Sequence, residues 1–274
     1  MRFPLSLITL ALSTSAIAQQ GEPPLEHIIV TGSRVVENID EVPASVTVIT
    51  REQIDAQLKV SPELQNLLEV LVPGMAPSTN SSSNTGQSLR GRAPLIMIDG
   101  VPQSTPLRNG SLGVRTLDPS VIERIEVIKG ATSVYGNGAA GGVINYITKK
   151  PKSSDGTTLS LDVSGRVSGV QTDESLGGRV EAAINGRNNQ FSYLVTASVE
   201  QNGVQRDAEG DILGLQYGLS DVETHNYFSK LGYQFDNEKS LSLTYNYYRS
   251  QQKTDLGDVF GNVNSGDKSY AIHV

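Results

Sequence analysis

The chain has 274 residues, of which 37% are hydrophobic and 19% charged, and its 22 basic and 29 acidic residues give a net charge of −7. This composition excludes a disordered chain, a coiled coil and a collagen. The absence of cysteine excludes disulfides, thiolate metal sites and cysteine nucleophiles, and the acidic balance argues against nucleic acid as a partner.

Residues 1–18 have the pattern of a secretory signal peptide. Arg2 supplies one positive charge, residues 3–12 are an apolar run, and residues 16–18 are a small-x-small cleavage sequence. A membrane-spanning helix needs about 20 apolar residues, and this run is shorter. We therefore expect export, with a mature chain that begins near Gln19.

Residues 26–32 are an apolar, β-prone stretch in the otherwise polar leader formed by residues 19–39. Two interpretations remain open for them. They are either the first strand of the following domain or a free strand that pairs with the sheet edge of a partner through backbone hydrogen bonds.

Residues 40–150 mix short apolar strands with helical stretches, which predicts a small α+β domain, named here the mixed domain. Strands are expected at residues 46–49, 95–98, 121–128 and 143–148. Thr50 and Gln53 have the spacing of a capping box and predict a helix after the first strand. Ser61-Pro62 predicts the start of a second helix, with leucines along one face and Pro73-Gly74 as its end.

After a polar linker, residues 151–274 alternate between apolar and polar side chains. The alternating segments are residues 159–167, 179–185, 191–200, 225–235 and 241–247. Short turns at residues 185–189 and 236–239 contrast with a long connection at residues 201–224. This combination predicts antiparallel transmembrane β-strands. The alternative is a soluble antiparallel sheet with one wet face, which alternates in the same way.

The motifs for enzymatic chemistry are weak. Residues 136–141 match G-x-G-x-x-G, but a dinucleotide site needs a helix to follow, and residues 142–148 predict a strand. The histidines, His27, His225 and His273, lack metal-ligand spacing. Asp99 is a candidate catalytic acid, but its Asp-Gly context favours a turn residue.

Glu123 and Glu126 are a second candidate acid/base pair. Residues i and i+3 of a strand point to opposite faces, so a structural ion pair is the better interpretation. The sequence therefore predicts no enzyme, no metal site and no cofactor.

The order of these segments resembles that of the TonB-dependent outer-membrane receptors over nearly the whole chain. The motifs that carry the resemblance are residues 26–32 (the TonB box), 42–49 (the first strand of the plug), 89–92 and 96–102 (its central motifs), 122–136 (its strongest signature) and 141–150 (its end). Residues 90–95, 131–136 and 214–217 look most like the ferric aerobactin receptor branch.

The resemblance implies a plug domain inside a 22-stranded β-barrel in the Gram-negative outer membrane. Such receptors bind ferric siderophores, cobalamin or similar scarce nutrients, and the periplasmic C-terminal domain of TonB then pulls on the box to open the plug. Ferric complexes of hydroxamate–citrate type carry negative charge, so cationic and amide groups on the apical plug loops are expected to hold them.

The resemblance also assigns three sets of residues. The TonB-binding set is Glu26, His27, Ile28, Ile29, Val30, Thr31 and Gly32. The ligand-binding set is Arg92, Gln103, Arg108, Asn109 and Arg115. The set expected to contact the barrel wall is Arg90, Glu123, Arg124 and Glu126.

The number of residues after position 150 is 274 − 150 = 124, which accommodates about five strands at roughly 25 residues per strand and connection. We therefore expect a plug attached to the first strands of a barrel, and no transport by this chain alone. Other functional hypotheses are a cobalamin receptor, a secreted NAD-binding oxidoreductase and a purely structural surface barrel or phage receptor.

Overall fold

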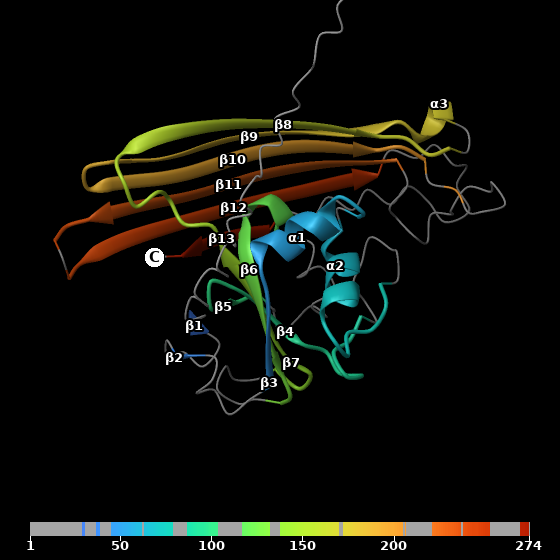
Figure 1. Cartoon of the computed structure of the whole chain (residues 1–274), viewed down its shortest axis with the longest axis horizontal. Helices are drawn as coiled ribbons and strands as arrows, with labels where there is room; N and C mark the ends of the chain where they lie inside the picture. The colour runs from blue at the N-terminus through green and yellow to red at the C-terminus, as the bar shows by residue number, and fades with distance from the viewer. Residues whose placement is uncertain are drawn as a thin grey trace, which may run out of the picture.

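The computed structural model describes residues 29–30, 37–38, 45–61, 63–78, 87–103, 117–131, 138–169, 172–204, 206, 221–236, 238–252 and 269–273. The mixed domain packs against one face of a long antiparallel sheet (Figure 1). A short ribbon, β1 (Ile29–Val30) paired with β2 (Glu37–Asn38), precedes both. No helix in the described part of the chain is long and apolar enough to cross a membrane.

A five-stranded sheet in the order β3-β6-β7-β4-β5 forms the centre of the mixed domain. Its strands are β3 (Ser45–Ile49), β4 (Leu95–Ile98), β5 (Val101–Pro102), β6 (Ile122–Lys129) and β7 (Gly142–Thr148). All neighbours are antiparallel except β4 and β7, which run parallel. The four expected strands are confirmed, and β5 is an addition that the sequence did not indicate because it has only two residues.

Two helices cover this sheet, α1 (Arg51–Leu58) and α2 (Leu64–Leu71). The capping box at the start of α1 is confirmed, because Thr50 and Gln53 exchange both hydrogen bonds. The predicted start of α2 at Ser61-Pro62 is wrong: the helix begins at Leu64. The Ser61 hydroxyl accepts a hydrogen bond from the Asn66 side chain instead of capping a backbone amide.

The long sheet consists of six strands in the sequential order β8 to β13. They are β8 (Gly156–Arg166), β9 (Gly177–Asn188), β10 (Phe191–Asn202), β11 (Val222–Gln234), β12 (Ser240–Gln252) and β13 (Ser269–His273). The short helix α3 (Thr172–Ser175) lies between β8 and β9. The five alternating segments are confirmed as β8 to β12, whereas β13 was not predicted.

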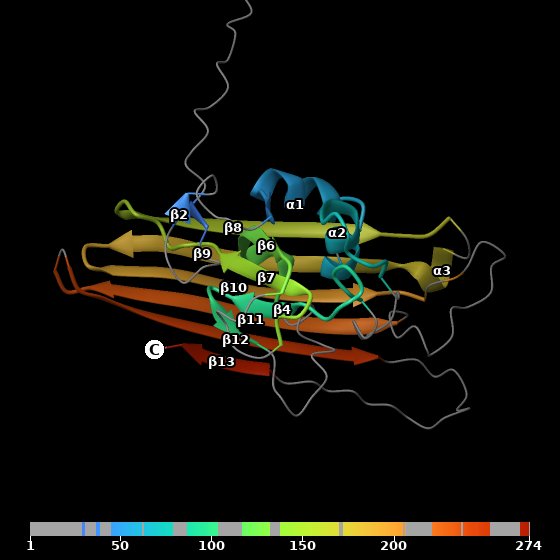
Figure 2. The ribbon, with the colours of Figure 1, turned by 90° about the horizontal axis from the view of Figure 1, so that it is seen from below.

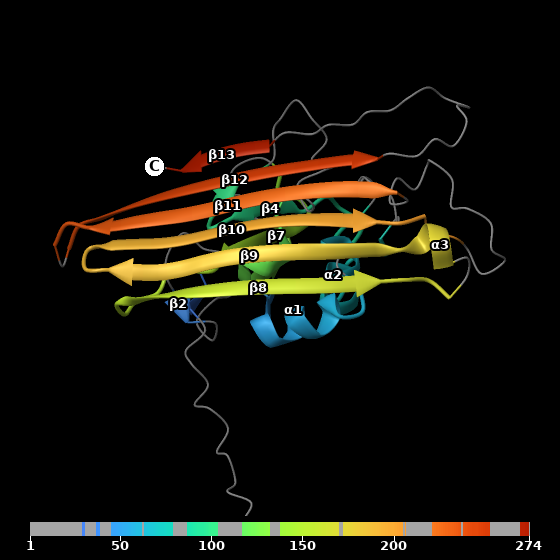
Figure 3. The same cartoon turned by 90° about the horizontal axis from the view of Figure 1, so that it is seen from above.

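Figure 3 shows the face of the long sheet that points away from the mixed domain. The side chains exposed on this face are largely apolar. Val199 on β10 and Tyr227 on β11 are 43% and 45% exposed, although both lie in central strands. The polar side chains between them, such as Ser198 and Asn226, are only 4% and 6% exposed. A soluble sheet with one wet face would bury the apolar side. The pattern is therefore that of a wall with polar residues inside and apolar residues outside.

The core of the mixed domain extends into the long sheet. Tyr146, Ile54 and Leu67 are fully buried at its centre, and Leu194 of β10 and Phe228 of β11 belong to the same apolar cluster. The long sheet thus supplies part of the packing of the mixed domain. The two layers form one structural unit.

Candidate contact site between the mixed domain and the long sheet

The first polar contact between the two layers centres on Asp118, whose side chain is 3% exposed. Asp118 precedes the 3₁₀ turn η2 (Pro119–Val121) and caps it by accepting a hydrogen bond from the Ser120 amide at 2.9 Å. An aspartate before proline suits this position, because its carboxylate satisfies an amide at the start of the turn. The carboxylate is thereby held facing the long sheet.

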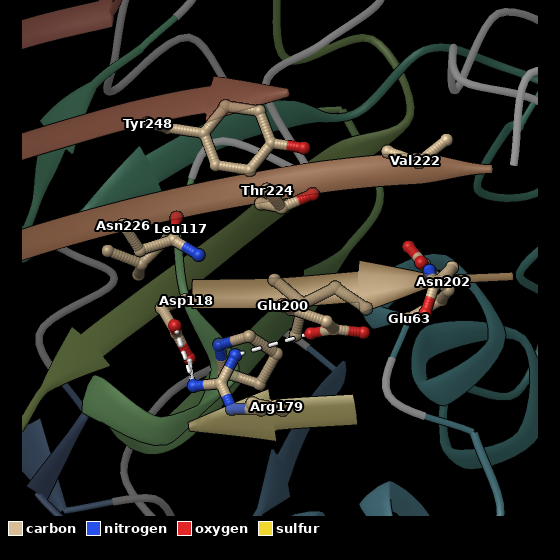
Figure 4. A pocket seen from close by; sticks show the side chains of 12 residues that line it. Glu63, Leu117, Asp118, Arg179, Glu200, Asn202, Val222, Thr224, Asn226 and Tyr248 are labelled. Atoms are coloured by element: carbon tan, nitrogen blue, oxygen red, sulfur yellow. Dashed lines mark hydrogen bonds and ion pairs between the residues drawn. The ribbon is translucent and has the colours of Figure 1, made fainter. Parts of the chain in front are cut away.

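Two side chains of the long sheet donate to the same carboxylate, and Figure 4 shows the one from Arg179. Arg179 on β9 donates Nη2 to both oxygens of Asp118, at 2.8 and 2.7 Å, and Ser198 on β10 donates its hydroxyl at 2.6 Å. Alternation places Arg179 and Ser198 on the polar inner face of the sheet. Asp118 therefore anchors the mixed domain to two adjacent strands.

Arg179 is also the centre of an ion-pair network on the inner face. It lies 2.6 Å from Glu181 on its own strand and 3.3 Å from Glu200 on β10. Glu200 is shared with Arg166 of β8 at 2.5 Å. The network spans three neighbouring strands, so side chains of the long sheet itself also hold the guanidinium of Arg179.

The ionisation of Asp118 follows from its surroundings. Burial alone would raise the pKa of this carboxyl, but the charge of Arg179 and the hydrogen bonds from Ser198, Arg179 and the Ser120 amide lower it by more. The net effect is a pKa below the ordinary value. Asp118 is therefore a charged group at neutral pH.

A second polar contact lies on β11. Lys230 donates its ammonium to Asp99 at 2.9 Å and to the Thr148 hydroxyl at 2.8 Å. Asp99 also accepts hydrogen bonds from the amide and the hydroxyl of Thr148, at 2.9 and 2.6 Å. Asp99 has φ 47° at the turn between β4 and β5, so its interpretation as a turn residue is confirmed. It is at the same time an anchor to the sheet.

A pocket of about 40 Å³ adjoins the Asp118 contact (Figure 4). Its lining includes Glu63 from the mixed domain and Asn202, Thr224 and Asn226 from the long sheet. Within the described part of the chain, the Oδ1 atoms of Asn202 and Asn226 are buried and have no hydrogen-bond partner. The volume suits about one water molecule, which would supply the missing donors.

A wider cleft of about 740 Å³ separates α1 from the inner face of β8 and β9. Charged side chains line it from both layers, among them Lys59 and Lys149 from the mixed domain and Asp162 from β8. Burial, followed by the neighbouring charge of Arg51, lowers the pKa of Lys149. The cleft is thus polar and carries charges of both signs.

Comparison with known proteins identifies the mixed domain. Residues 38–143 match the family model of the TonB-dependent Receptor Plug Domain. The chain belongs to the TonB-dependent receptor family. From here on the mixed domain is called the plug and the long sheet the wall.

Relatives of this chain carry names of receptors and of a transporter. The chain is 29% identical over 265 residues to a rhizobactin receptor of Rhizobium meliloti, which covers 93% of this chain and 35% of the relative. It is 31% identical over 256 residues to a ferric aerobactin receptor of Klebsiella pneumoniae, covering 92% and 34%. A vitamin B12 transporter of Vibrio vulnificus is 29% identical over 261 residues, covering 92% and 40%.

Among solved structures, a variant of the ferric enterobactin receptor from Pseudomonas aeruginosa is 26% identical with a TM-score of 0.58. The match covers 81% of this chain and 34% of that one. The chain therefore spans about a third of the length of the relatives it matches.

The structure describes only some of the residues expected to bind ligand. Arg92 is exposed, on a tight turn formed by residues 89–92, where Leu89 and Arg92 exchange backbone hydrogen bonds at 2.9 and 3.2 Å. Gln103 is half-buried, and its side chain donates to the Val101 carbonyl at 3.0 Å. The other three, Arg108, Asn109 and Arg115, lie outside the described residues. Ligand binding by this set stays a prediction.

Of the TonB-box set, the structure describes only Ile29 and Val30, which form β1. The rest of the set, Glu26, His27, Ile28, Thr31 and Gly32, lies outside the described residues. In the structure, β1 pairs with β2 of the same chain. Binding of this segment to a partner stays a prediction.

The residues expected to contact the barrel wall occupy different environments. Glu126 is fully buried and pairs with Arg124 at 2.7 Å, and Arg90 and Glu123 are exposed. Their contact with a wall stays a prediction. The contacts that the structure does give, through Asp99 and Asp118, were missed because their partners lie far away in sequence. The signal available was the alternation, which places Arg179 and Lys230 on an inner face where a buried charge needs a partner.

We predict that Asp118→Asn weakens the plug–wall contact and flattens its dependence on acid. The free energy of unfolding at neutral pH is expected to fall by about 2 kcal/mol, because a hydrogen-bonded charge is lost while Arg179 keeps its two glutamates. Since the folded pKa of Asp118 is below the unfolded value, its stabilisation is present above about pH 4 and is lost as the pH falls through the folded pKa.

Urea unfolding of the wild type and of Asp118→Asn between pH 7 and pH 2 measures the free energy of unfolding and its pH dependence. Asp55→Asn is the matched control, because Asp55 also pairs with an arginine but is half exposed, so its loss is expected to cost under about 0.5 kcal/mol. An unchanged pH dependence in Asp118→Asn would contradict the prediction.

Proposed function

We propose that the chain is part of an outer-membrane receptor for TonB-dependent uptake of ferric siderophores. The observation that carries this proposal is the plug packed on the polar inner face of a sheet whose outer face is apolar. An apolar exterior suits lipid, and a polar interior suits a folded plug and a hydrated path past it. The signal peptide expected at residues 1–18 agrees with export to that membrane.

The siderophore class we propose is the hydroxamate–citrate type. Its support is the similarity to receptors named for aerobactin and rhizobactin. The expected ligand residues include three arginines and two amides, a donor set that suits an anionic ferric complex. Cobalamin is the second candidate, supported by the similarity to a vitamin B12 transporter. The NAD-binding alternative loses its basis, because β7 follows Gly141 where a dinucleotide site needs a helix.

A charge on the outer face tests the membrane part of the proposal. Leu161, on β8, is 71% exposed. Leu161→Arg is expected to make the free energy of folding into phospholipid vesicles less favourable by about 2–4 kcal/mol. Val70→Arg is the matched control, because Val70 is 62% exposed on the plug helix α2. Denaturant titration of the vesicle-bound fraction measures both. Equal effects of the two substitutions would exclude a lipid-facing wall.

The partner that we propose for residues 26–32 is the periplasmic C-terminal domain of TonB. Binding by strand addition needs backbone donors, and proline removes one, so Ile29→Pro is expected to reduce the affinity for TonB at least about tenfold while leaving ligand affinity unchanged. Ile29→Val keeps the donor and is the control. Titration of the purified chain with the TonB domain measures this, and wild-type affinity of the proline variant would refute it.

The charge argument for the ligand is tested on Arg108 and Arg115. In a receptor of full family length that carries this plug, Arg108→Ala and Arg115→Ala are each expected to weaken ferric aerobactin binding about tenfold, because each removes a charge-assisted hydrogen bond. Arg108→Lys retains the charge and serves as control. Titration with the ferric complex gives the affinity, and if both alanine variants bind as the wild type does, the proposed ligand class falls.

A further inference from the structure

Arg51, the first residue of α1, holds the turn that carries Asp118. Its Nη1 donates to the carbonyl of Pro119 at 2.8 Å and to the carbonyl of Ile122. Pro119 begins η2 and Ile122 follows its last residue, so a single guanidinium bonds to both ends of the turn from the side of α1. The rest of the guanidinium pairs with Asp55 one helical turn later.

The same turn is held from the other side by the wall. Its carboxylate, Asp118, accepts hydrogen bonds from Arg179 and Ser198, as described above. The Lys149 amide at the end of β7 donates to the Val121 carbonyl at 2.8 Å and completes the turn. The turn that follows Asp118 is therefore bonded to α1 and to the residue after β7, while Asp118 itself is bonded to the wall.

The two plug–wall contacts differ in how they connect to the N-terminal segment, by which we mean residues 19–39. α1 follows β3 directly, and β3 is at the edge of the described plug sheet, paired only with β6. The Lys230 contact instead involves Asp99 and Thr148, which end the parallel strands β4 and β7. Figure 2 shows the plug in front of the wall, with α1 over β8 and β4 over β11. The Asp118 contact is made to β9 and β10 and the Lys230 contact to β11, so the two contacts lie at separate places on the wall.

We propose that Arg51 is a positioning residue that couples the N-terminal segment to the Asp118–Arg179 contact. Displacement of β3 and α1 withdraws Arg51 from the two carbonyls, the turn loosens, and Asp118 releases the wall while the Lys230 contact remains closed. The role in transport rests on the proposed function, because TonB is the partner that would displace the segment. The coupling between Arg51 and the Asp118–Arg179 contact does not rest on the proposed function.

Hydrogen exchange on the purified full chain in detergent, without TonB or ligand, tests the coupling. The reporters are the amides of Ser120 and Lys149, which both bond within the turn. Arg51→Gln and Arg179→Gln are each expected to speed their exchange about tenfold, the effect of one lost charge-assisted bond. If the two residues act through one turn, the double variant also exchanges about tenfold faster, not a hundredfold.

Lys230→Gln is the matched comparison. Its contact is separate, so its effect on exchange is expected to multiply with that of Arg51→Gln. Multiplication of the effects of Arg51→Gln and Arg179→Gln would overturn the proposal.

Two further variants separate the carbonyl contacts from other roles of Arg51. Asp55→Asn removes only the pair within α1 and should leave both amides at the wild-type rate. Arg51→Lys keeps the charge but loses the forked donor, so an intermediate rate is expected, and it serves where Arg51→Gln fails to fold. A wild-type rate for Arg51→Lys, or an Asp55→Asn rate equal to that of Arg51→Gln, would overturn the role of the carbonyl contacts. If the chain does not bind the TonB domain, the proposed function loses its partner, but the hydrogen-exchange test of the coupling is unaffected.

Discussion

The structure depends on the polar inner face of the wall. Because the outer face is apolar, the polar side chains of the central wall strands β10 and β11 collect on the other side, where Thr196, Ser198 and Asn226 are each less than 9% exposed. Polar groups buried in this way need hydrogen-bond partners, or they cost free energy. The plug provides some of them through side chains at its turns. Asp118 accepts hydrogen bonds from Arg179 and Ser198, and Asp99 accepts one from Lys230.

The interactions that hold the plug against the wall differ from those that determine its position on the wall. Leu194 and Phe228 reach from the wall into the plug core, and burial of such side chains contributes about 1.5–3 kcal/mol each. A buried ion pair contributes much less in net terms, because desolvation offsets most of the attraction. Its requirement for a partner of opposite charge at one geometry is nevertheless strict. The apolar contacts therefore hold the plug against the wall, and Asp118 and Asp99 determine where it sits.

Local signals in the sequence predicted most of the elements. Period-two alternation found β8 to β12, and the Thr50–Gln53 spacing found α1, because these patterns depend on neighbours within a few residues. Ser61 misled for the same local reason, since a different side chain, that of Asn66, occupies its hydroxyl. The site was harder to predict. Asp118 and Arg179 are 61 residues apart, and alternation shows that Arg179 points inward without showing which acid it meets.

The placement of the two contacts gives the plug unequal attachment. Asp99 follows β4, which pairs with β7 in the middle of the sheet, so releasing Asp99 from Lys230 by moving the backbone would disturb the central pairing. Asp118 belongs to a turn that α1 supports, and the edge strand before α1 is held by five residue pairs to β6. Elements at a sheet edge open at lower free energy than those at the centre. Opening at this edge would therefore release the Asp118 contact before the Lys230 contact, and it would also withdraw Ile54 of α1 from the core that Phe228 shares.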